Sequence, residues 1–167
     1  MKSLTQQLGQ YAAYHRDRRN VMTHFVGIPM ILLAATILLA RPTFVVGEWF
    51  ISPALPIAAV LTLYYLRLDL RYGLVMGVLL ALSLAIAGEV ADGGRASWLA
   101  WGIGLFVVGW IIQFVGHHYE GRKPAFLDDV MGLAIGPLFV VAEAGFLLGL
   151  RKEVEASIES GVPTPAK

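Results

Sequence analysis

The chain has 167 residues, of which 57% are hydrophobic and only 15% are charged. The net charge is +1, there is no cysteine, and the mean hydropathy is +0.66. A soluble domain of this length could not bury so much apolar surface, so the composition indicates a membrane protein. The near-neutral charge does not indicate a nucleic-acid-binding protein. The lack of cysteine excludes disulfides, thiolate nucleophiles and cysteine-ligated metal centres.

The first twenty residues are polar and lack the early apolar core of a signal peptide. Ser3 and Gln6 fit a capping box that would start a short amphipathic helix lying on the membrane surface. His15 extends its apolar stripe. His24 lies nine positions after His15, so one unbroken helix would point the two rings in opposite directions. We expect Asn20 or Thr23 to cap a new helix. A turn there would bring the two imidazoles together.

Five apolar runs predict an all-α fold, a polytopic bundle of about five transmembrane segments behind an N-terminal interfacial helix. The runs are continuously apolar, which excludes the alternating strands of a membrane β-barrel. Gly27-Ile28-Pro29 is expected to open the first span, with Pro29 at a helix start or a kink. We predict a single membrane-embedded helical domain over 1–150 and a solvated polar tail over 151–167. The expected segments are 24–40, 49–66, 72–91, 96–116 and 130–150.

The distribution of Lys and Arg predicts the orientation of the chain. Five spans would leave eight of these residues on the side of the N-terminus and five on the other side. The first side is therefore expected to be cytoplasmic. All four histidines would then lie at the cytoplasmic face, either of the cytoplasmic membrane in a bacterium or of the endoplasmic reticulum in a eukaryote.

The histidines form two clusters, His15 with His24 and His117 with His118. His117 and Glu120 have the i, i+3 spacing that lets an imidazole and a carboxylate share a metal ion. Gln113 lies one turn before His117 and could hold the second nitrogen of its ring. Nitrogen and oxygen donors suit zinc, or iron with open positions for oxygen. Four imidazoles are too few for the two irons of the membrane desaturases, which favours a single metal ion, or two metal ions bridged by carboxylates.

Other polar residues near these clusters have simpler explanations. The side-chain amide of Asn20, four residues before His24, could orient that ring. Asp128 and Asp129 are expected to cap the fifth segment. Glu143 lies well inside the fifth apolar run, where an ionisable side chain is costly and usually faces a partner within the bundle. A protonated Glu143 that forms a hydrogen bond between helices is the alternative to a functional role.

Together, these motifs resemble a widespread family of small membrane proteins that includes the iron-dependent 2-hydroxy fatty acid dioxygenase of fungal phytosphingosine breakdown. The similarity extends over nearly the whole chain, from about Tyr14 to Arg151. It rests on Tyr14-His15-Arg16, Asn20-x-x-x-His24-x-x-Gly27-x-Pro29, Gln113-Phe114-x-Gly116-His117-x-x-Glu120, Pro124-Ala125 and Gly136-Pro137-Leu138-Phe139-x-x-x-Glu143.

The resemblance implies α-oxidation, in which a long-chain 2-hydroxy fatty acid and molecular oxygen give the acid shorter by one carbon. It implies an Fe(II) cofactor, with zinc possible as isolated, and a substrate whose tail lies among membrane lipid. By position, His15, His24 and His117 match the family's histidines. His118, a fourth candidate ligand, falls on no matching position. Glu120 and Glu143 match the family's acids and are the candidate catalytic residues.

Three residues are candidates for binding the substrate, namely Arg122, Lys123 and Asn20. The two cations, or the arginines near His15, could pair with the carboxylate of the acid. Two other classes of protein stay open: a haem- or metal-binding membrane protein without dioxygenase activity, whose histidines pair across helices, and a small transporter that uses Glu143 as a proton carrier. Against a transporter, the polar residues gather at one face and form no path across the membrane.

Overall fold

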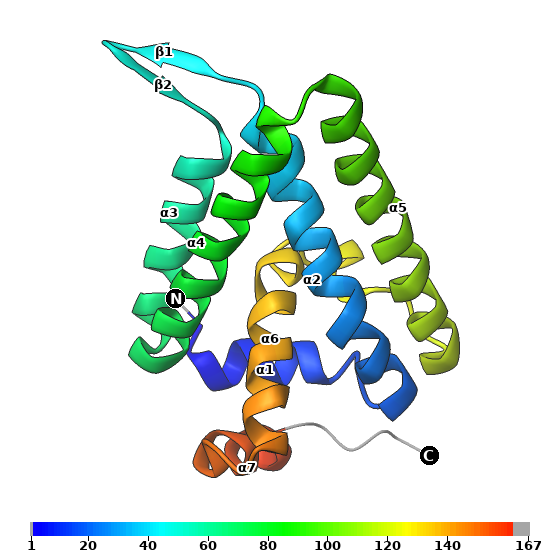
Figure 1. Cartoon of the computed structure of the whole chain (residues 1–167). Coiled ribbons are helices and arrows are strands. Elements are labelled where there is room, and N and C mark those ends of the chain that lie inside the picture. The colour runs from blue at the N-terminus through cyan, green and yellow to red at the C-terminus, as the bar shows by residue number, and fades with distance from the viewer. Residues whose placement is uncertain (1, 162–167) are drawn as a thin grey trace. The chain divides into compact units, whose positions relative to one another are not determined.

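The structure, a computed structural model, describes residues 2–161, apart from the side chains of residues 46, 49 and 50. Within these residues the chain is almost entirely α-helical, so the predicted all-α fold is confirmed (Figure 1). A short antiparallel hairpin of strands β1 (Phe44–Val46) and β2 (Trp49–Ile51) is the exception. The helices are α1 (Leu4–Ala12), α2 (Arg18–Ala40), α3 (Ala54–Leu68), α4 (Leu70–Asp92), α5 (Arg95–Glu120), α6 (Gly132–Leu147) and α7 (Lys152–Gly161), with a 3-10 turn η1 (Ala125–Leu127).

Three helices, α2, α4 and α5, are long and apolar enough to cross a membrane, with 23, 23 and 26 residues. Helix α3 has 15 residues, which extend about 22 Å and fall short of a hydrocarbon core of about 30 Å. Helices α6 and α7 pass the test only together, as a pair bent by 116°. The described chain therefore has three candidate spans, or four with the bent pair, where the sequence predicted about five.

By its contacts the chain divides into two compact units. The first comprises Met1–Phe25 and Ile112–Lys167, and the second comprises Val26–Ile111. The boundaries fall within α2 and α5, so each of these helices contributes residues to both units. The single domain predicted for 1–150 stays a prediction.

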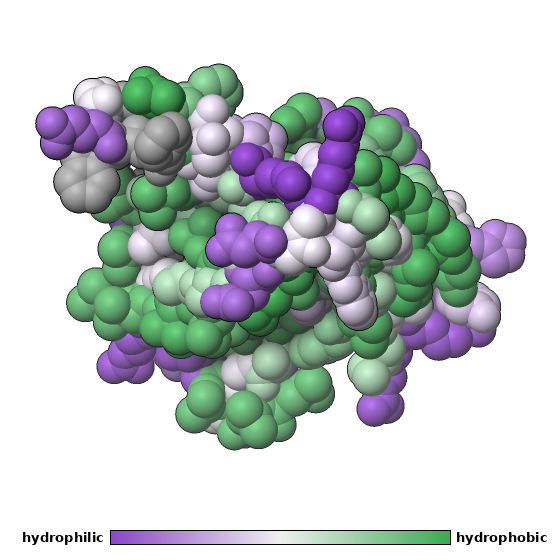
Figure 2. Space-filling view, turned by 45° about the horizontal axis from the view of Figure 1, so that its top comes forward, coloured by the Kyte–Doolittle hydropathy of each residue, from purple (hydrophilic) through white to green (hydrophobic). Residues whose placement is uncertain are grey.

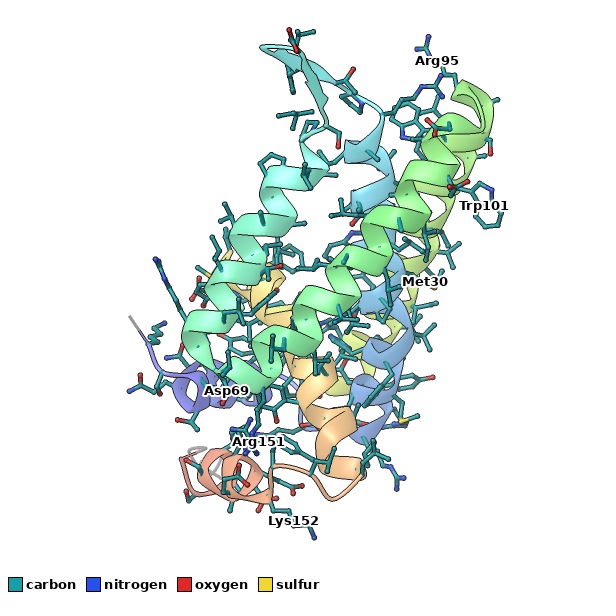
Figure 3. All side chains as sticks on the ribbon, turned by 60° about the vertical axis from the view of Figure 1, so that its left-hand side comes forward. Met30, Asp69, Arg95, Trp101, Arg151 and Lys152 are labelled. Carbon is teal, nitrogen blue, oxygen red and sulfur yellow. The ribbon has the colours of Figure 1, made fainter. Side chains whose placement is uncertain are left out.

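In the second unit, α3 and α4 form a tight helical hairpin with one residue between them. That residue is Asp69, which caps α4 by accepting a hydrogen bond from the backbone N–H of Tyr72 at 3.0 Å. Figure 3 shows Asp69 at this turn. A capping aspartate satisfies one of the free N–H groups at a helix start. The sharp turn lets two apolar helices run side by side.

Helix α4 carries a row of exposed apolar side chains along one face. They recur every fourth residue, which places them on a single stripe of the helix. Figure 2 shows hydrophobic residues over broad areas of the visible face, with hydrophilic residues in separate groups. Such a stripe fits contact with lipid and would be unfavourable in water. Its members are Leu70, Leu74, Val78, Leu82 and Ile86.

The first long helix starts earlier than the sequence predicted. Helix α2 begins at Arg18, and Asp17 precedes it, with Asp17 Oδ1 accepting the N–H of Arg19 at 2.8 Å. The prediction that Asn20 or Thr23 caps this helix was therefore wrong, because an acidic side chain three residues earlier takes that role. Pro29 is accordingly an interior proline of α2, not a residue of its first turn.

The first unit is built around α1, which packs against α6 and α7. The capping box of Ser3 and Gln6 is confirmed. Val154 and Ile158 of α7 are buried, whereas most of its other residues are exposed, so the predicted polar tail includes a short helix with one buried apolar face. Two apolar residues four positions apart were too weak a signal among charged neighbours. Residues 162–167 of the predicted tail lie outside the described residues.

Candidate metal site

Three of the four histidines come together in the first unit. Each of His15, His24 and His117 offers a ligand nitrogen, and these nitrogens lie within 4.8 Å of one another. The ring centroids are 4.4 Å apart for His15 and His24, and 5.1 Å apart for each other pair. All three side chains are buried, with at most 7% of their surface exposed. The three residues come from the turn after α1, from α2 and from the last turn of α5.

Hydrogen bonds fix the orientation of two of these rings. His15 Nδ1 lies 2.7 Å from the carbonyl oxygen of Tyr11, and His24 Nδ1 lies 2.8 Å from that of Asn20. A carbonyl can only accept, so each Nδ1 carries the proton and donates it. The Nε2 atom of each ring then keeps its lone pair. A backbone carbonyl that selects the ligating nitrogen in this way is common around metal-binding histidines.

Two ring nitrogens of the group are buried without a partner among the described residues. They are Nε2 of His15 and Nδ1 of His117. Leaving a buried polar atom unsatisfied costs about 1–3 kcal/mol. A metal ion bound by these nitrogens would remove that cost, so the residues present fit a metal ion.

Burial also controls the protonation of His15. It lowers the pKa of this imidazole to about 4, although the hydrogen bond to the Tyr11 carbonyl acts in the opposite direction. The nearby His117 lowers the pKa further. The ring is therefore neutral at physiological pH, which is the form that binds metal ions.

Aromatic side chains enclose one side of the cluster. Tyr11 stacks on His15 with ring centroids 4.2 Å apart and planes 7° from parallel. Phe139 of α6 lies 4.9 Å from Tyr11 and 5.6 Å from His15. The sequence offered a signal for Tyr11, which lies one helical turn before His15, but its place beside the site was not predicted.

Glu120 lies at the end of α5, where its carboxylate contacts the turn that precedes α2. Its carboxylate accepts the backbone N–H groups of Arg16 and Asp17 at 3.0 and 2.8 Å. It also accepts the side-chain N–H of Asn20 at 3.0 Å. Glu120 is not among the residues whose donor atoms converge. The carboxylate thus ties the end of α5 to the turn that carries His15 into α2.

A glycine lets α2 and α5 approach closely beside the cluster. A Cβ atom on Gly116 would lie 2.0 Å from Thr23 Oγ1 and 2.5 Å from Asn20 Oδ1. No ordinary side chain fits such a gap. His117 directly follows Gly116. The absence of a side chain at Gly116 therefore lets the ring of His117 come close to that of His24.

Two amides lie near the histidines with unsatisfied oxygens. The oxygen atoms are Oδ1 of Asn20 and Oε1 of Gln113, both buried and without a partner among the described residues. His24 bonds to the backbone carbonyl of Asn20, so the prediction that the side-chain amide orients this ring was wrong. Gln113 forms no hydrogen bond with His117 within residues 2–161.

The remaining predicted residues lie outside the group of converging nitrogens. His118 is exposed, with its ring 6.2 Å from that of Tyr119. Arg122 donates to the carbonyl of Ala13 at 3.0 Å. Lys123 pairs with Asp128. These two cations are exposed and hold the segment after α5.

The acidic residues after α5 separate into different roles. Asp129 accepts the N–H of Met131 at 3.0 Å, just before α6 begins, whereas Asp128 accepts a hydrogen bond from Tyr14 at 3.0 Å. Glu143 is half-buried on α6, where Glu155 of α7 is a neighbouring charge. It is not brought to the histidines.

The fold and the cluster together define a small helical membrane protein with a candidate three-histidine metal site. The chain belongs to the family described as "2-hydroxy-palmitic acid dioxygenase Mpo1-like", whose model matches residues 1–147. It is 36% identical over 159 residues to the protein named 2-hydroxy-palmitic acid dioxygenase MPO1 of Saccharomyces cerevisiae. The match covers 93% of this chain and 87% of that protein. The family predicted from the motifs is thus confirmed, and no solved structure matches the chain.

Proposed function

We propose that this protein is a metal-dependent dioxygenase that shortens long-chain 2-hydroxy fatty acids by one carbon. Membership of the family and the name of the yeast relative support the reaction. The observation that carries the proposal is the buried group of three histidines. In a balanced overall reaction, one 2-hydroxy acid and one O₂ give the shorter acid, carbon dioxide and water.

The metal ion we propose is Fe(II), held by His15, His24 and His117. Three protein nitrogens would leave coordination positions open for exogenous ligands. Zinc can bind the same donors, but it has no redox chemistry and would give an inactive form. When bound, iron would supply a place where dioxygen and the two oxygens of the hydroxy acid meet. The neutral state of His15 supports this assignment, because a protonated imidazole cannot ligate.

The surrounding residues would bind and shield the substrate. Tyr11 and Phe139 cover one side of the cluster and would exclude water there. The buried amide of Gln113, one turn before His117, would hydrogen-bond to the 2-hydroxyl group. Arg122 and Lys123 would attract the carboxylate to this end of the protein, and the Lys/Arg distribution supports a cytoplasmic orientation of that end.

The geometry favours a single ion over a haem. Two axial imidazoles must lie on opposite faces of a porphyrin, whereas three rings here converge with centroids no more than 5.1 Å apart. Glu143 has no described polar chain linking it to the histidines, so no observation favours a transporter.

The metal assignment is tested by measuring metal content. Single alanine replacements of His15, His24 and His117 should each remove most of the bound metal after purification in iron-supplemented medium. His118→Ala is the matched control, because this neighbouring histidine is exposed, and it should keep full occupancy. Equal metal content in all four variants would contradict the assignment.

The reaction is tested with iron-loaded protein and 2-hydroxyhexadecanoic acid. Mass spectrometry should detect the fifteen-carbon acid in air and not under argon. The His117→Ala variant should form none. Turnover that does not require oxygen, or no turnover by protein with iron demonstrably bound, would contradict the dioxygenase.

A further inference from the structure

The first unit contains a cavity of about 680 Å³ between α1, the start of α6 and α7. This volume lies within the roughly 300–1,000 Å³ of ordinary small-ligand sites. Its buried floor includes Tyr11, Ile135 and Ile158. Its exposed rim includes Gln10 and Asp129. The cavity therefore has a mainly apolar interior, whose lining also includes the buried Gln7, and a polar mouth.

The floor of this cavity reaches the histidine cluster. Tyr11 lines the cavity and stacks directly on His15, 4.2 Å between ring centroids. Ile135 lines the cavity, and Phe139, one turn further along α6, contacts both Tyr11 and His15. A single aromatic ring thus separates the cavity from the proposed metal site.

The charges around the cavity indicate which part of a ligand it suits. Its lining residues include no Lys, Arg or His within the described chain, and Asp129 is acidic. The nearby ammonium of Lys2 donates to Gln10 at 2.9 Å and lies 3.8 Å from Asp129. The single carboxylate at the mouth, with the neighbouring ammonium of Lys2 already engaged, favours an uncharged ligand over a carboxylate.

From these relationships we propose that the cavity receives the hydrocarbon chain of the 2-hydroxy acid, past the edge of Tyr11, while its hydroxyl and carboxylate lie at the histidines. This proposal rests on the proposed function, because it takes the identity of the substrate from there. It adds a chain-length site that involves α1, α6 and α7. The amphipathic α7, with Val154 and Ile158 buried, would then form part of the substrate site.

A larger side chain at Gly9 would fill part of the cavity. It lines the cavity, and a Cβ built on it meets no atom within 4 Å. Leucine is a better helix former than glycine, so Gly9→Leu should leave α1 folded. The matched control is Gly104→Leu on α5, where a Cβ also meets nothing within 4 Å and which lies outside the lining of this cavity.

The experiment compares acids of eight and sixteen carbons. Their binding to metal-free protein is measured by displacement of a fluorescent fatty acid, and their turnover by iron-loaded protein. Gly9→Leu should weaken binding of the sixteen-carbon 2-hydroxy acid about tenfold, as expected for overpacking. It should raise the KM for that acid, and it should change neither value for the eight-carbon acid by more than about twofold. Gly104→Leu should match the wild type for both acids.

Two outcomes would overturn the cavity assignment. One is that Gly9→Leu changes the binding of the two acids equally, or changes the binding of neither. The other is a loss of binding in Lys2→Gln as large as that in Gly9→Leu, which would place the carboxylate at the mouth. The proposed function is judged separately: chain-length-selective binding without turnover in the wild type would keep the cavity and reject the dioxygenase.

Discussion

The carboxylate of Glu120 and the side-chain amide of Asn20 share a hydrogen bond of 3.0 Å across a hundred residues of sequence. Asn20 in turn presents its backbone carbonyl to His24 Nδ1 at 2.8 Å. Glu120 lies three residues after His117 on the same helix. This hydrogen bond therefore connects the part of α2 that carries His24 to the end of α5 that carries His117.

Glu120 is accordingly expected to position the site without ligating the metal. Glu120→Gln replaces a charged acceptor of several N–H groups with a neutral amide, and hydrogen bonds to charged groups are worth about 1.5–3 kcal/mol. We expect iron affinity to fall about tenfold, with faster hydrogen exchange in the turn over residues 13–17. Glu159→Gln, at an exposed position of α7, is the control.

The alternative, a ligating Glu120, gives a different pattern. Replacing a ligand would alter the electronic spectrum of the bound metal while leaving exchange in the turn unchanged. That pair of results would show the positioning role to be wrong.

Glu143→Gln should reduce turnover less than Glu120→Gln, because an amide can replace a protonated carboxyl in a hydrogen bond between helices.

The close approach at Gly116 predicts a severe effect from a single methyl group. In Gly116→Ala the new Cβ would lie 2.0 Å from Thr23 Oγ1, so α2 and α5 must separate locally. Overpacking costs about 1–3 kcal/mol, and His117 would move away from His24. We expect metal occupancy to fall below half, measured on folded protein selected by size-exclusion chromatography. Gly104→Ala, with open space around its Cβ, should keep full occupancy.

A rescue variant distinguishes this clash from a general loss of helix packing. Thr23→Ala removes the nearest atom, so combining it with Gly116→Ala should restore part of the lost metal. No recovery in the double variant would mean that the contact with Thr23 does not set the distance between the helices.

The stability of the metal-free protein should depend on pH through His15. The pKa of its imidazole is about 4 in the folded protein, against an ordinary value of 6.5. Between these values the unfolded chain binds a proton that the folded chain excludes, so stability is present above about pH 6.5 and is lost as the pH falls toward 4. The effect should amount to a few kcal/mol. Thermal unfolding in detergent should show a flatter pH profile for His15→Gln, and an unchanged profile would contradict this assignment.

Much of this site was accessible from the sequence because its elements are local. The spacing of His117 and Glu120, and the motif around His15 and His24, identified the family and the histidines that converge. The partners of Glu120 were not accessible, since the backbone N–H groups of Arg16 and Asp17 belong to a turn about a hundred residues away. Spacing on one helix suggested a shared metal ion, but those distant donors hold the carboxylate.

The fold shows the same division between local and long-range information. Continuous apolar runs predicted helices correctly, yet the length of α3 depends on where the hairpin of β1 and β2 ends. The burial of α7 depends on a face of α1 that becomes available only after folding. The sequence left a helix start or a kink open at Pro29, because the start of α2 depends on the turn around Asp17.

The last prediction concerns Gln113, whose buried Oε1 has no partner among the described residues. Gln113→Leu removes an unsatisfied polar group and keeps a similar volume, so the metal-free protein should unfold at the same or a higher temperature. The variant should lose the preference for 2-hydroxyhexadecanoic over hexadecanoic acid, because the amide would no longer bond to the hydroxyl group. Affinities for both acids, measured on one preparation, provide the ratio of the two affinities.

As a control, Thr36→Val removes a buried hydroxyl that bonds to Leu32 within α2, and it should leave this ratio unchanged. An unaltered ratio in Gln113→Leu, together with a lower unfolding temperature, would assign the amide to packing and leave the recognition of the 2-hydroxyl to the metal ion alone.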